Sequence, residues 1–150
     1  MANSLDIKII EQLMAQARTS WVDLGNLLGL SAPATADRVH KLEEAGVITG
    51  YSALINPDEV GCGLAAFIAV TLDKPEHRKN FLELVKASPK ILECHHIAGN
   101  EDYIIKVRCA DTRALEKLIS NELKALPGIK TRTTIILSTM KETPVLPINK

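Results

Sequence analysis

Four residues between positions 34 and 41 have the types and the helical spacing of a nucleic-acid reading surface: Ala34, Asp37, Arg38 and Lys41. Arginine and lysine donate hydrogen bonds to guanine or phosphate, aspartate can accept from a cytosine amino group, and an alanine methyl can contact thymine. The alternative is an ordinary solvated helix face, on which Arg38 and Lys41 only pair with Asp37 and Glu44.

The first of two short helices expected to position these residues begins near Trp21. Ser20 is a typical N-cap, because its hydroxyl can accept a hydrogen bond from a free backbone N–H group. Gly29 easily takes the left-handed conformation that ends a helix. The apolar face of this helix is expected to consist of Leu24, Leu27 and Leu28.

The second helix is expected to begin after Ser31, which is again an N-cap residue. Its inward side is predicted from three residues at helical spacing, namely Thr35, Val39 and Leu42. Two helices joined by a tight turn at residues 29–31 form a helix-turn-helix, whose second helix enters the major groove of DNA. The predicted DNA-contacting residues are Ser31, Pro33, Ala34, Thr35, Asp37, Arg38 and Lys41.

The charge balance predicts that one copy of this motif binds DNA weakly. The whole chain has 18 Lys and Arg against 18 Asp and Glu, and residues 1–50 contain four basic residues against six acidic ones. Phosphate neutralisation supplies much of the affinity for DNA. Several copies are therefore expected to act together, so that modest affinities multiply.

Length and composition restrict the class of protein. A chain of 150 residues with 46% hydrophobic residues can form one domain or two small ones. It has no apolar run of about 18 residues and no secretory signal at its start, so we expect a cytoplasmic protein. The three cysteines, Cys62, Cys94 and Cys109, are widely spaced, which favours reduced thiols.

The remainder of the first half is expected to add a helix, a wing and a linker. Apolar residues at helical spacing predict a helix over residues 4–17, and residues 47–55 resemble a strand–turn–strand hairpin that would form a small wing. A stretch rich in Pro, Asn and Gly then predicts a hinge. The expected domain boundaries are 1–50 for the winged helix-turn-helix, 51–63 for the linker strand and hinge, and 64–150 for a second domain.

The second half predicts an α+β domain of the ferredoxin-like β-α-β-β-α-β type. The expected elements are strands at 64–72, 91–98, 103–109 and 131–140, with helices at 76–87 and 112–125. Such a sheet carries both helices on one face and leaves the other uncovered. Because residues 64–72 are apolar on both faces, we expect a second copy to cover the open face.

The turn Gly99-Asn100-Glu101-Asp102 could hold a small zwitterion such as an amino acid. Its backbone N–H groups can donate to a carboxylate, and Asp102 can accept from an ammonium group. The alternative is a plain hairpin turn, which these residue types form commonly.

A metal site is not predicted at Cys94-His95-His96, even with Cys109 on the next strand. Alternation along a strand places Cys94 and His96 on one face and His95 on the other. Structural zinc requires four ligands in close paired spacing, which this sequence lacks. No cofactor is expected.

A winged helix-turn-helix followed by a βαββαβ domain, with Gly-x-x-Asp-Tyr after its second strand, resembles the Lrp/AsnC family of leucine-responsive or feast/famine transcriptional regulators. The resemblance spans nearly the whole chain, and it is specific because several short motifs occur in order at matching spacing. The stretches that carry it are Leu5-Asp6, Leu28-Gly29-Leu30-Ser31, residues 38–48, residues 51–57, Glu93-Cys94-His95, residues 99–103 and Leu126-Pro127-Gly128-Ile129.

The resemblance implies double-stranded DNA as a partner, homodimers formed through the sheets of the second domain, and tetramers of dimers (octamers). It also implies amino-acid effectors bound in clefts between dimers, with part of the pocket supplied by a neighbouring subunit. The effector-binding residues implied are Gly99, Asn100, Glu101, Asp102, Tyr103, Leu126, Thr134 and Ile136. Two departures, His40 where relatives often carry a basic residue and the outward Asp37, suggest weaker or more selective DNA binding.

Three functions follow as hypotheses. The first is a sequence-specific transcriptional regulator whose DNA binding or assembly responds to an amino acid. The second is an architectural, nucleoid-type DNA-binding protein without an effector, which would show little sequence preference. The third, an enzyme on a ferredoxin-like fold, lacks any nucleophile–base pair, phosphate loop or paired carboxylates in the sequence.

Overall fold

The structure is a computed structural model that describes residues 3–149, and its contacts divide the chain into two compact units. The first unit contains the residues up to Leu54 together with those from Lys141 onward, and the second is Ile55–Met140. The sequence-based boundaries assigned the chain end to the second domain. The structure instead groups the segment from Lys141 onward with the helix-turn-helix.

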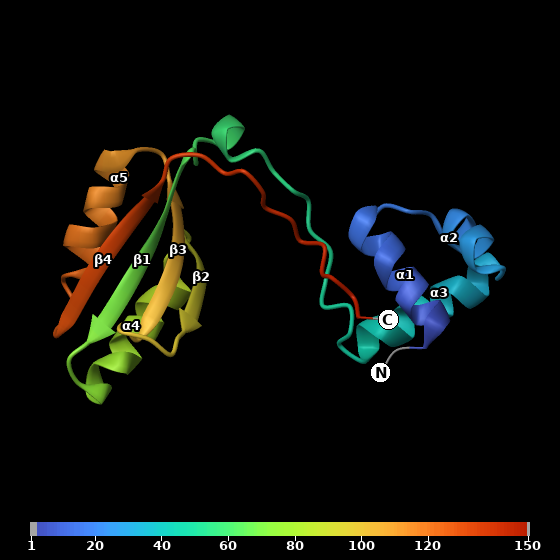
Figure 1. The fold of residues 1–150 in the computed structure, drawn as a ribbon, viewed down its shortest axis with the longest axis horizontal. Coiled ribbons are helices and arrows are strands. Elements are labelled where there is room, and N and C mark those ends of the chain that lie inside the picture. The colour runs from blue at the N-terminus through green and yellow to red at the C-terminus, as the bar shows by residue number, and fades with distance from the viewer. Residues whose placement is uncertain (1–2, 150) are drawn as a thin grey trace. The chain divides into compact units, whose positions relative to one another are not determined.

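Three helices form the first unit: α1 (Ser4–Ala15), α2 (Trp21–Leu28) and α3 (Ala32–Glu44) (Figure 1). Each begins at a side-chain cap, because Asn3, Ser20 and Ser31 accept hydrogen bonds from backbone N–H groups of the first turns. Helix α2 ends at Gly29, whose φ of 69° is left-handed as predicted. The first helix was predicted to reach residue 17 but ends at Ala15.

The core of the first unit consists of five apolar side chains: Ile9, Leu13, Leu24, Val39 and Leu42. The predicted inward side of α3 is confirmed. The prediction for Leu27 is wrong, because its side chain is 61% exposed while Leu24 and Gly25 face the core. A Cβ added at Gly25 would lie 2.6 Å from the carbonyl oxygen of Leu30, so the turn and α2 approach too closely for a side chain there.

The predicted wing at residues 47–55 is wrong, since the described chain forms no strand in this region. Gly46 takes a left-handed φ of 72° after α3. The N–H groups of Val47 and Ile48 then both donate to the carbonyl of Leu42, at 2.9 and 3.1 Å. Backbone groups that complete the end of a helix are not available to pair with a second strand.

The second unit confirms the predicted β-α-β-β-α-β order. Its elements are β1 (Leu64–Leu72), α4 (Arg78–Ala87), β2 (Ile91–His96), β3 (Tyr103–Cys109), α5 (Thr112–Lys117) with a π-helical continuation at Leu118–Leu123, and β4 (Ile129–Ile136). The sheet order is β2-β3-β1-β4, and all neighbours are antiparallel. The bounds of β1 and β3 match the predictions.

Other predicted bounds in this unit need correction. The helix predicted at 76–87 starts as a 3₁₀ turn, Pro75–His77, and becomes α-helical at Arg78. The strand predicted at 91–98 ends at His96, and the helix predicted at 112–125 changes to π-helix after Lys117. The last strand was predicted at 131–140, but it begins directly after the left-handed Gly128 and ends at Ile136.

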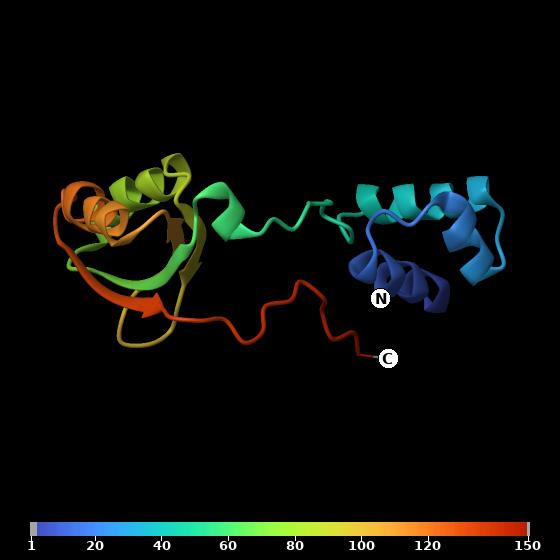
Figure 2. The ribbon, with the colours of Figure 1, turned by 90° about the horizontal axis from the view of Figure 1, so that it is seen from above.

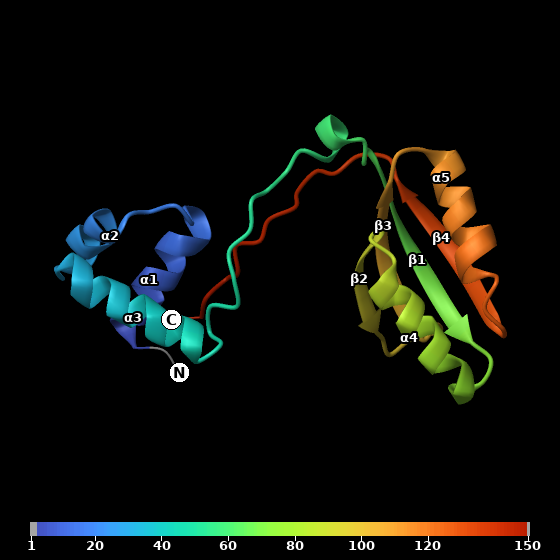
Figure 3. The ribbon, with the colours of Figure 1, turned by 180° about the vertical axis from the view of Figure 1, so that it is seen from behind.

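Helices α4 and α5 cover the same face of the sheet, as Figure 2 shows from above and Figure 3 from the helix side. The twelve-residue core between these layers is Ala66, Ile68, Val70, Phe81, Ile91, Tyr103, Ile105, Val107, Cys109, Leu115, Leu118 and Leu123. On the opposite face of β1, Ala65 and Ala69 flank Phe67, which is 39% exposed. The unit therefore has an open sheet face with an apolar centre.

Candidate functional site

The exposed side of α3 contains most of the predicted DNA-contacting residues: Ser31, Pro33, Ala34, Asp37 and Lys41. The hydroxyl of Ser31 accepts from the N–H of Ala34 at 3.3 Å, so the first turn of the helix is ordered by its own cap. Helix α3 thus presents its N-terminal turns to solvent while its apolar side packs on α1 and α2.

Lys41 and Asp37 form an ion pair one helical turn apart, with 2.9 Å between Nζ and Oδ2. Both side chains are mostly exposed, so water competes strongly with the pair. Exposed pairs of this kind contribute about 0.3–0.5 kcal/mol. Lys41 can therefore exchange Asp37 for a phosphate at little cost.

Arg38 is held differently from the other residues of this surface. Its Nη1 lies 3.1 Å from Oδ1 of Asp6 in α1, and about a third of the side chain is exposed. The alternative weighed from the sequence paired Arg38 with its own helix. The structure instead uses Nη1 of Arg38 to connect α3 to α1.

Thr35 is a correction to the predicted DNA-contacting residues. It is completely buried, and its hydroxyl donates to the carbonyl of Ser31 at 2.8 Å. A side chain enclosed in the core and bonded within its own helix is not part of the exposed surface. The helical spacing of Thr35, Val39 and Leu42 predicted this inward position correctly, whereas the assignment of Thr35 to the DNA-contacting residues did not.

The structure also identifies two supporting residues that sequence reasoning did not assign. Trp21 at the start of α2 meets His40 of α3 edge-to-face, with ring centroids 5.9 Å apart. Gly25 lets the turn approach α2 closely. Both residues support the position of α3. Their only signals in the sequence were a glycine inside a predicted helix and an aromatic residue directly after an N-cap.

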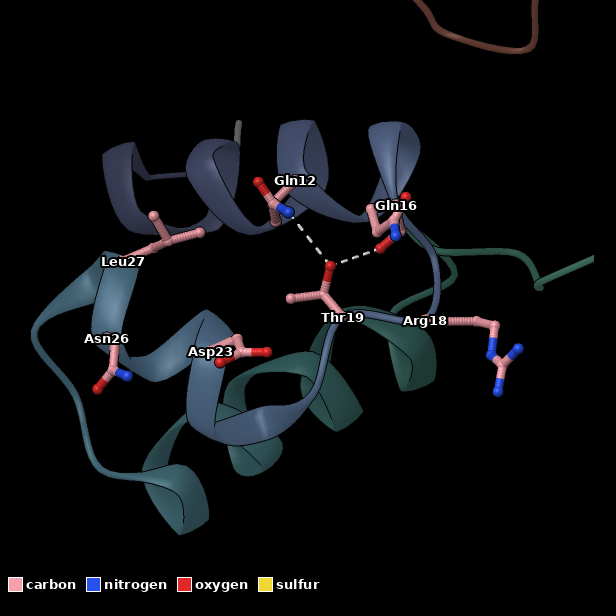
Figure 4. A pocket seen from close by; sticks show the side chains of 7 residues that line it. All are labelled: Gln12, Gln16, Arg18, Thr19, Asp23, Asn26 and Leu27. Atoms are coloured by element: carbon pink, nitrogen blue, oxygen red, sulfur yellow. Dashed lines mark hydrogen bonds between the residues drawn. The ribbon is translucent and has the colours of Figure 1, made fainter.

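A polar pocket of about 490 Å³ lies beside α1 and α2 (Figure 4), lined by Gln12, Gln16, Arg18, Thr19, Asp23, Asn26 and Leu27. Thr19 accepts from Nε2 of Gln12 at 3.2 Å and donates to the carbonyl of Gln16 at 2.7 Å. Arg18 points away from these groups in Figure 4. The bonds of Thr19 order the connection between α1 and α2.

Asp102 fastens the predicted effector loop to the end of β1. Its N–H donates to the carbonyl of Val70 at 2.9 Å, and its Oδ2 accepts from the N–H of Leu72 at 2.8 Å. The carbonyl of Asp102 also accepts from the N–H of Ile97 at 2.9 Å. Asp102 therefore has a structural role that the turn interpretation did not specify.

Glu101 lies next to this anchor and carries the other carboxylate of the loop. Its Oε1 accepts from Nε of Arg132 on β4 at 2.9 Å. The Glu101 side chain is 20% exposed, whereas that of Arg132 is 73% exposed. A carboxylate and a guanidinium thus stand together at the edge of the open sheet face, beside the exposed Gly99 and Asn100.

The remaining predicted effector residues do not converge on this loop within one chain. Tyr103 is buried, with its ring centroid 5.0 Å from those of Phe81 and His96. Leu126 packs against the core on the helix side. Thr134 pairs with Phe67 in the sheet, and alternation puts it with Ile136 on the open face.

The Cys94–His96 strand has the alternation expected from its sequence. Cys94 packs against the core beneath the helices, whereas Nε2 of His95 lies 3.0 Å from Oε1 of Glu93. Burial raises the pKa of the thiols of Cys94 and Cys109, which favours the protonated form that binds metals poorly. Among residues 3–149, no group of three or more His, Cys, Asp or Glu side chains is arranged to hold a metal ion.

No helix in the described part of the chain is both long and apolar enough to cross a membrane.

Two protein-family models match the sequence. The family model of the AsnC-type helix-turn-helix domain matches residues 3–43, and that of the Lrp/AsnC ligand binding domain matches residues 65–146.

The chain resembles curated relatives along almost its whole length. It is 37% identical over 147 residues to the leucine-responsive regulatory protein of Haemophilus influenzae, covering 96% of this chain and 89% of that protein. The protein of the same name from Escherichia coli K12 is 36% identical over 141 residues, covering 92% and 86%.

Solved structures of transcriptional regulators are also similar to this chain along almost its whole length. A transcriptional regulator of Neisseria meningitidis in complex with L-Met has a TM-score of 0.94 and 30% identity, covering 99% of this chain and 98% of that one. The feast or famine regulatory protein of Mycobacterium tuberculosis complexed with L-methionine has a TM-score of 0.89 and 35% identity, covering 96% and 97%. The chain therefore belongs to the Lrp/AsnC family, a family of DNA-binding transcriptional regulators and not of enzymes.

Proposed function

We propose that this chain regulates transcription by sequence-specific DNA binding through α3, and that an amino acid bound at the second unit changes that binding or the assembly of subunits. The observation that carries the DNA-binding part is the ordered, solvent-exposed N-terminal half of α3, capped by Ser31 and braced by α2. A regulator of this kind acts where the DNA is, which we take to be the cytoplasm.

The proposed DNA-contacting surface consists of Ser31, Pro33, Ala34, Asp37, Arg38 and Lys41. Arg38 joins it by exchanging Asp6 for a base or phosphate. The Asp6 side chain is 20% exposed and that of Arg38 is 33% exposed, so replacing this mostly buried pair costs more than breaking a surface pair. A bidentate contact of arginine with guanine is worth about 1–3 kcal/mol, so the exchange is favoured most where the cognate base is present.

Three variants test this surface on duplexes that the wild-type protein selects from a random-sequence library. Arg38→Ala should lower DNA affinity at least tenfold and relax the preference at one base position. Lys41→Ala should weaken binding to all DNA sequences about equally and reduce the salt dependence of the affinity. Asp6→Asn is the matched control, because it frees Arg38 without removing it and should retain binding. Unchanged affinity of an Arg38→Ala protein of normal oligomeric state would remove Arg38 from the surface.

For the effector, we propose that the loop at residues 99–102 and Arg132 hold the two charged ends of an amino acid. Glu101 would accept from the ammonium group, while Arg132 or the N–H groups of Gly99 and Asn100 would donate to the carboxylate. The proximity of Glu101 and Arg132 supports this proposal, as do the two similar proteins solved with methionine. Asp102 would hold the loop in place.

Calorimetry with L-methionine and L-leucine tests the effector site. Glu101→Gln should weaken binding at least tenfold while the protein stays folded, because the exposed Arg132 can turn to solvent and an amide can still accept its hydrogen bond. Glu93→Gln is the matched control, since Glu93 lies on β2 and pairs with His95. If no amino acid binds the wild-type protein, or if Glu101→Gln binds it normally, this assignment is wrong.

We further propose that the open sheet face pairs two copies into a dimer and that dimers assemble into a tetramer of dimers. Phe67 and Ile136 supply apolar area on that face. The proposed effector residues Thr134 and Ile136 would then lie near a neighbouring subunit, which would complete the pocket. Light scattering should show a smaller species for Phe67→Glu, and an unchanged mass would contradict the proposed interface.

A further inference from the structure

We propose that the C-terminal segment 141–149 is a strap that docks on the DNA-binding unit of its own chain and couples this unit to β4. The segment follows the second unit in sequence, yet its contacts group it with the helix-turn-helix. The first unit is therefore linked to the second by two stretches of chain, one on each side of Ile55–Met140.

The docking surface is formed by the C-terminal half of α1 and by residues 47–54. Together with the strap, they line an open cavity of about 630 Å³, and the strap contributes Pro144 and Leu146 to its wall. The N–H of Leu146 donates to Sδ of Met14 at 3.4 Å. The other apolar side chains lining this cavity include Ile10, Leu13, Val47, Ile48 and Leu54.

The sequence of the strap suits this role. Pro144 and Pro147 restrict the backbone, and the hydroxyl of Thr143 accepts from the N–H of Val145 at 3.2 Å. A segment that is already restricted loses less conformational entropy when it docks. Docking is shallow, because Leu146 remains 70% exposed, so small forces at either end can release it.

Covalent continuity joins the strap to the proposed effector site. Residues 137–143 lie between the end of β4 at Ile136 and Pro144, the first strap residue that lines the cavity, a stretch that spans at most about 25 Å when extended. β4 carries Arg132, Thr134 and Ile136. A displacement of β4 on effector binding would therefore reach α1 through one short stretch of chain; this coupling rests on the proposed function, whereas the docking does not.

Hydrogen exchange tests the docking. A variant ending at Met140 should exchange at least tenfold faster than the full chain at the hydrogen-bonded amides of residues 13–16, 47 and 48, with β1 and β3 unchanged. Leu146→Asp should reproduce the effect in the full-length protein. The matched control is Leu137→Asp, because Leu137 is almost fully exposed and does not line the cavity. Equal exchange rates in the wild type and in both test variants would overturn the proposed docking of the strap.

A mixing experiment distinguishes docking within one chain from docking between copies. Isotope-labelled variant ending at Met140 is mixed with unlabelled full-length protein, and its exchange is followed. We expect the amides of the labelled chain to keep their fast exchange. Recovered protection would mean that the strap of another copy occupies the surface, which would overturn docking within the chain.

The coupling is tested with L-methionine and a duplex selected by the wild-type protein. In the variant ending at Met140, the ratio of DNA affinities with and without methionine should fall towards one, while methionine binding measured by calorimetry is retained. A fully retained ratio would overturn the coupling. Absence of methionine and leucine binding in the wild type would instead refute the proposed effector, and hydrogen exchange would still decide the docking.

Discussion

The two units of this chain obtain their stability in different ways. The first has a core of five apolar side chains and begins each of its three helices at a side-chain cap. The second has twelve core residues between a sheet and two helices, and only α5 of these two helices begins at a side-chain cap, from Asp111. The DNA-binding unit thus has the smaller core and caps every one of its helices.

The same difference extends to the candidate sites. The exposed side of α3 lies on one helix that its own cap and neighbouring helices hold in place. The loop at residues 99–102 is anchored by Asp102, but Arg132, Thr134 and Ile136 lie on an open sheet face. The proposed DNA-contacting surface therefore lies within one chain, whereas the effector site is proposed to be completed by a neighbouring subunit.

The largest expected effect is in the core of the second unit. Phe81→Ala removes a completely buried ring that contacts Tyr103 and should cost about 3–5 kcal/mol of the free energy of unfolding, measured by urea denaturation. Phe67→Ala is the control of the same chemistry on the open face. Its effect should depend on protein concentration, because the face is proposed to pair copies. Equal, concentration-independent losses for both variants would contradict the division between core and open face.

Leu24→Ala should be next, at about 2–5 kcal/mol. Because Leu24 is one of five core residues, this loss should unfold the first unit while the circular-dichroism signal of the sheet persists. Leu27→Ala on the same helix is the control and should change stability by less than about 0.5 kcal/mol, since Leu27 is exposed. If both variants unfold both units together, the units are not independent.

A smaller effect is expected for Ser31→Ala, which removes the cap of α3. Loss of an N-cap side chain costs about 1 kcal/mol, and the melting temperature of the first unit should fall accordingly. Ser138→Ala, in an exposed stretch outside any helix, should leave it unchanged. If Ser31→Ala left the melting temperature unchanged, the helix caps would contribute less to the stability of this unit than we infer from its small core.

The smallest effect on stability is expected for Asp37→Asn. Its pair with Lys41 is exposed, so the free energy of unfolding should change by less than about 0.5 kcal/mol. DNA affinity at low salt should nevertheless rise, because an anion near the phosphates is removed. Fluorescence anisotropy and thermal melting separate the two effects, and a large loss of stability would contradict the assignment of Asp37 to the solvated surface.

Sequence reasoning succeeded where short-range signals determine structure. Ser31 and the inward spacing of Thr35, Val39 and Leu42 define α3, and the apolar run of β1 marks both of its ends. The wing failed because the N–H groups of residues 47 and 48 complete the end of α3, which a hydrophobic pattern does not reveal.

Long-range contacts were beyond the reach of the sequence. Arg38 meets Asp6, and Asp102 meets Leu72, across about thirty residues of chain in each case. Residue types allow many such partners, and only the packing of the elements selects one. For the same reason, the sequence alone could not associate the C-terminal segment with α1.

Gly25 has a consequence for genetics. Any side chain at this position collides with the carbonyl of Leu30, so nearly every substitution should displace the turn between α2 and α3. A random-mutagenesis screen for loss of repression or activation should therefore recover position 25 as often as positions on the exposed side of α3. A map of the DNA-contacting surface drawn from such alleles would include the buried Gly25, unless each mutant protein were first checked for its fold.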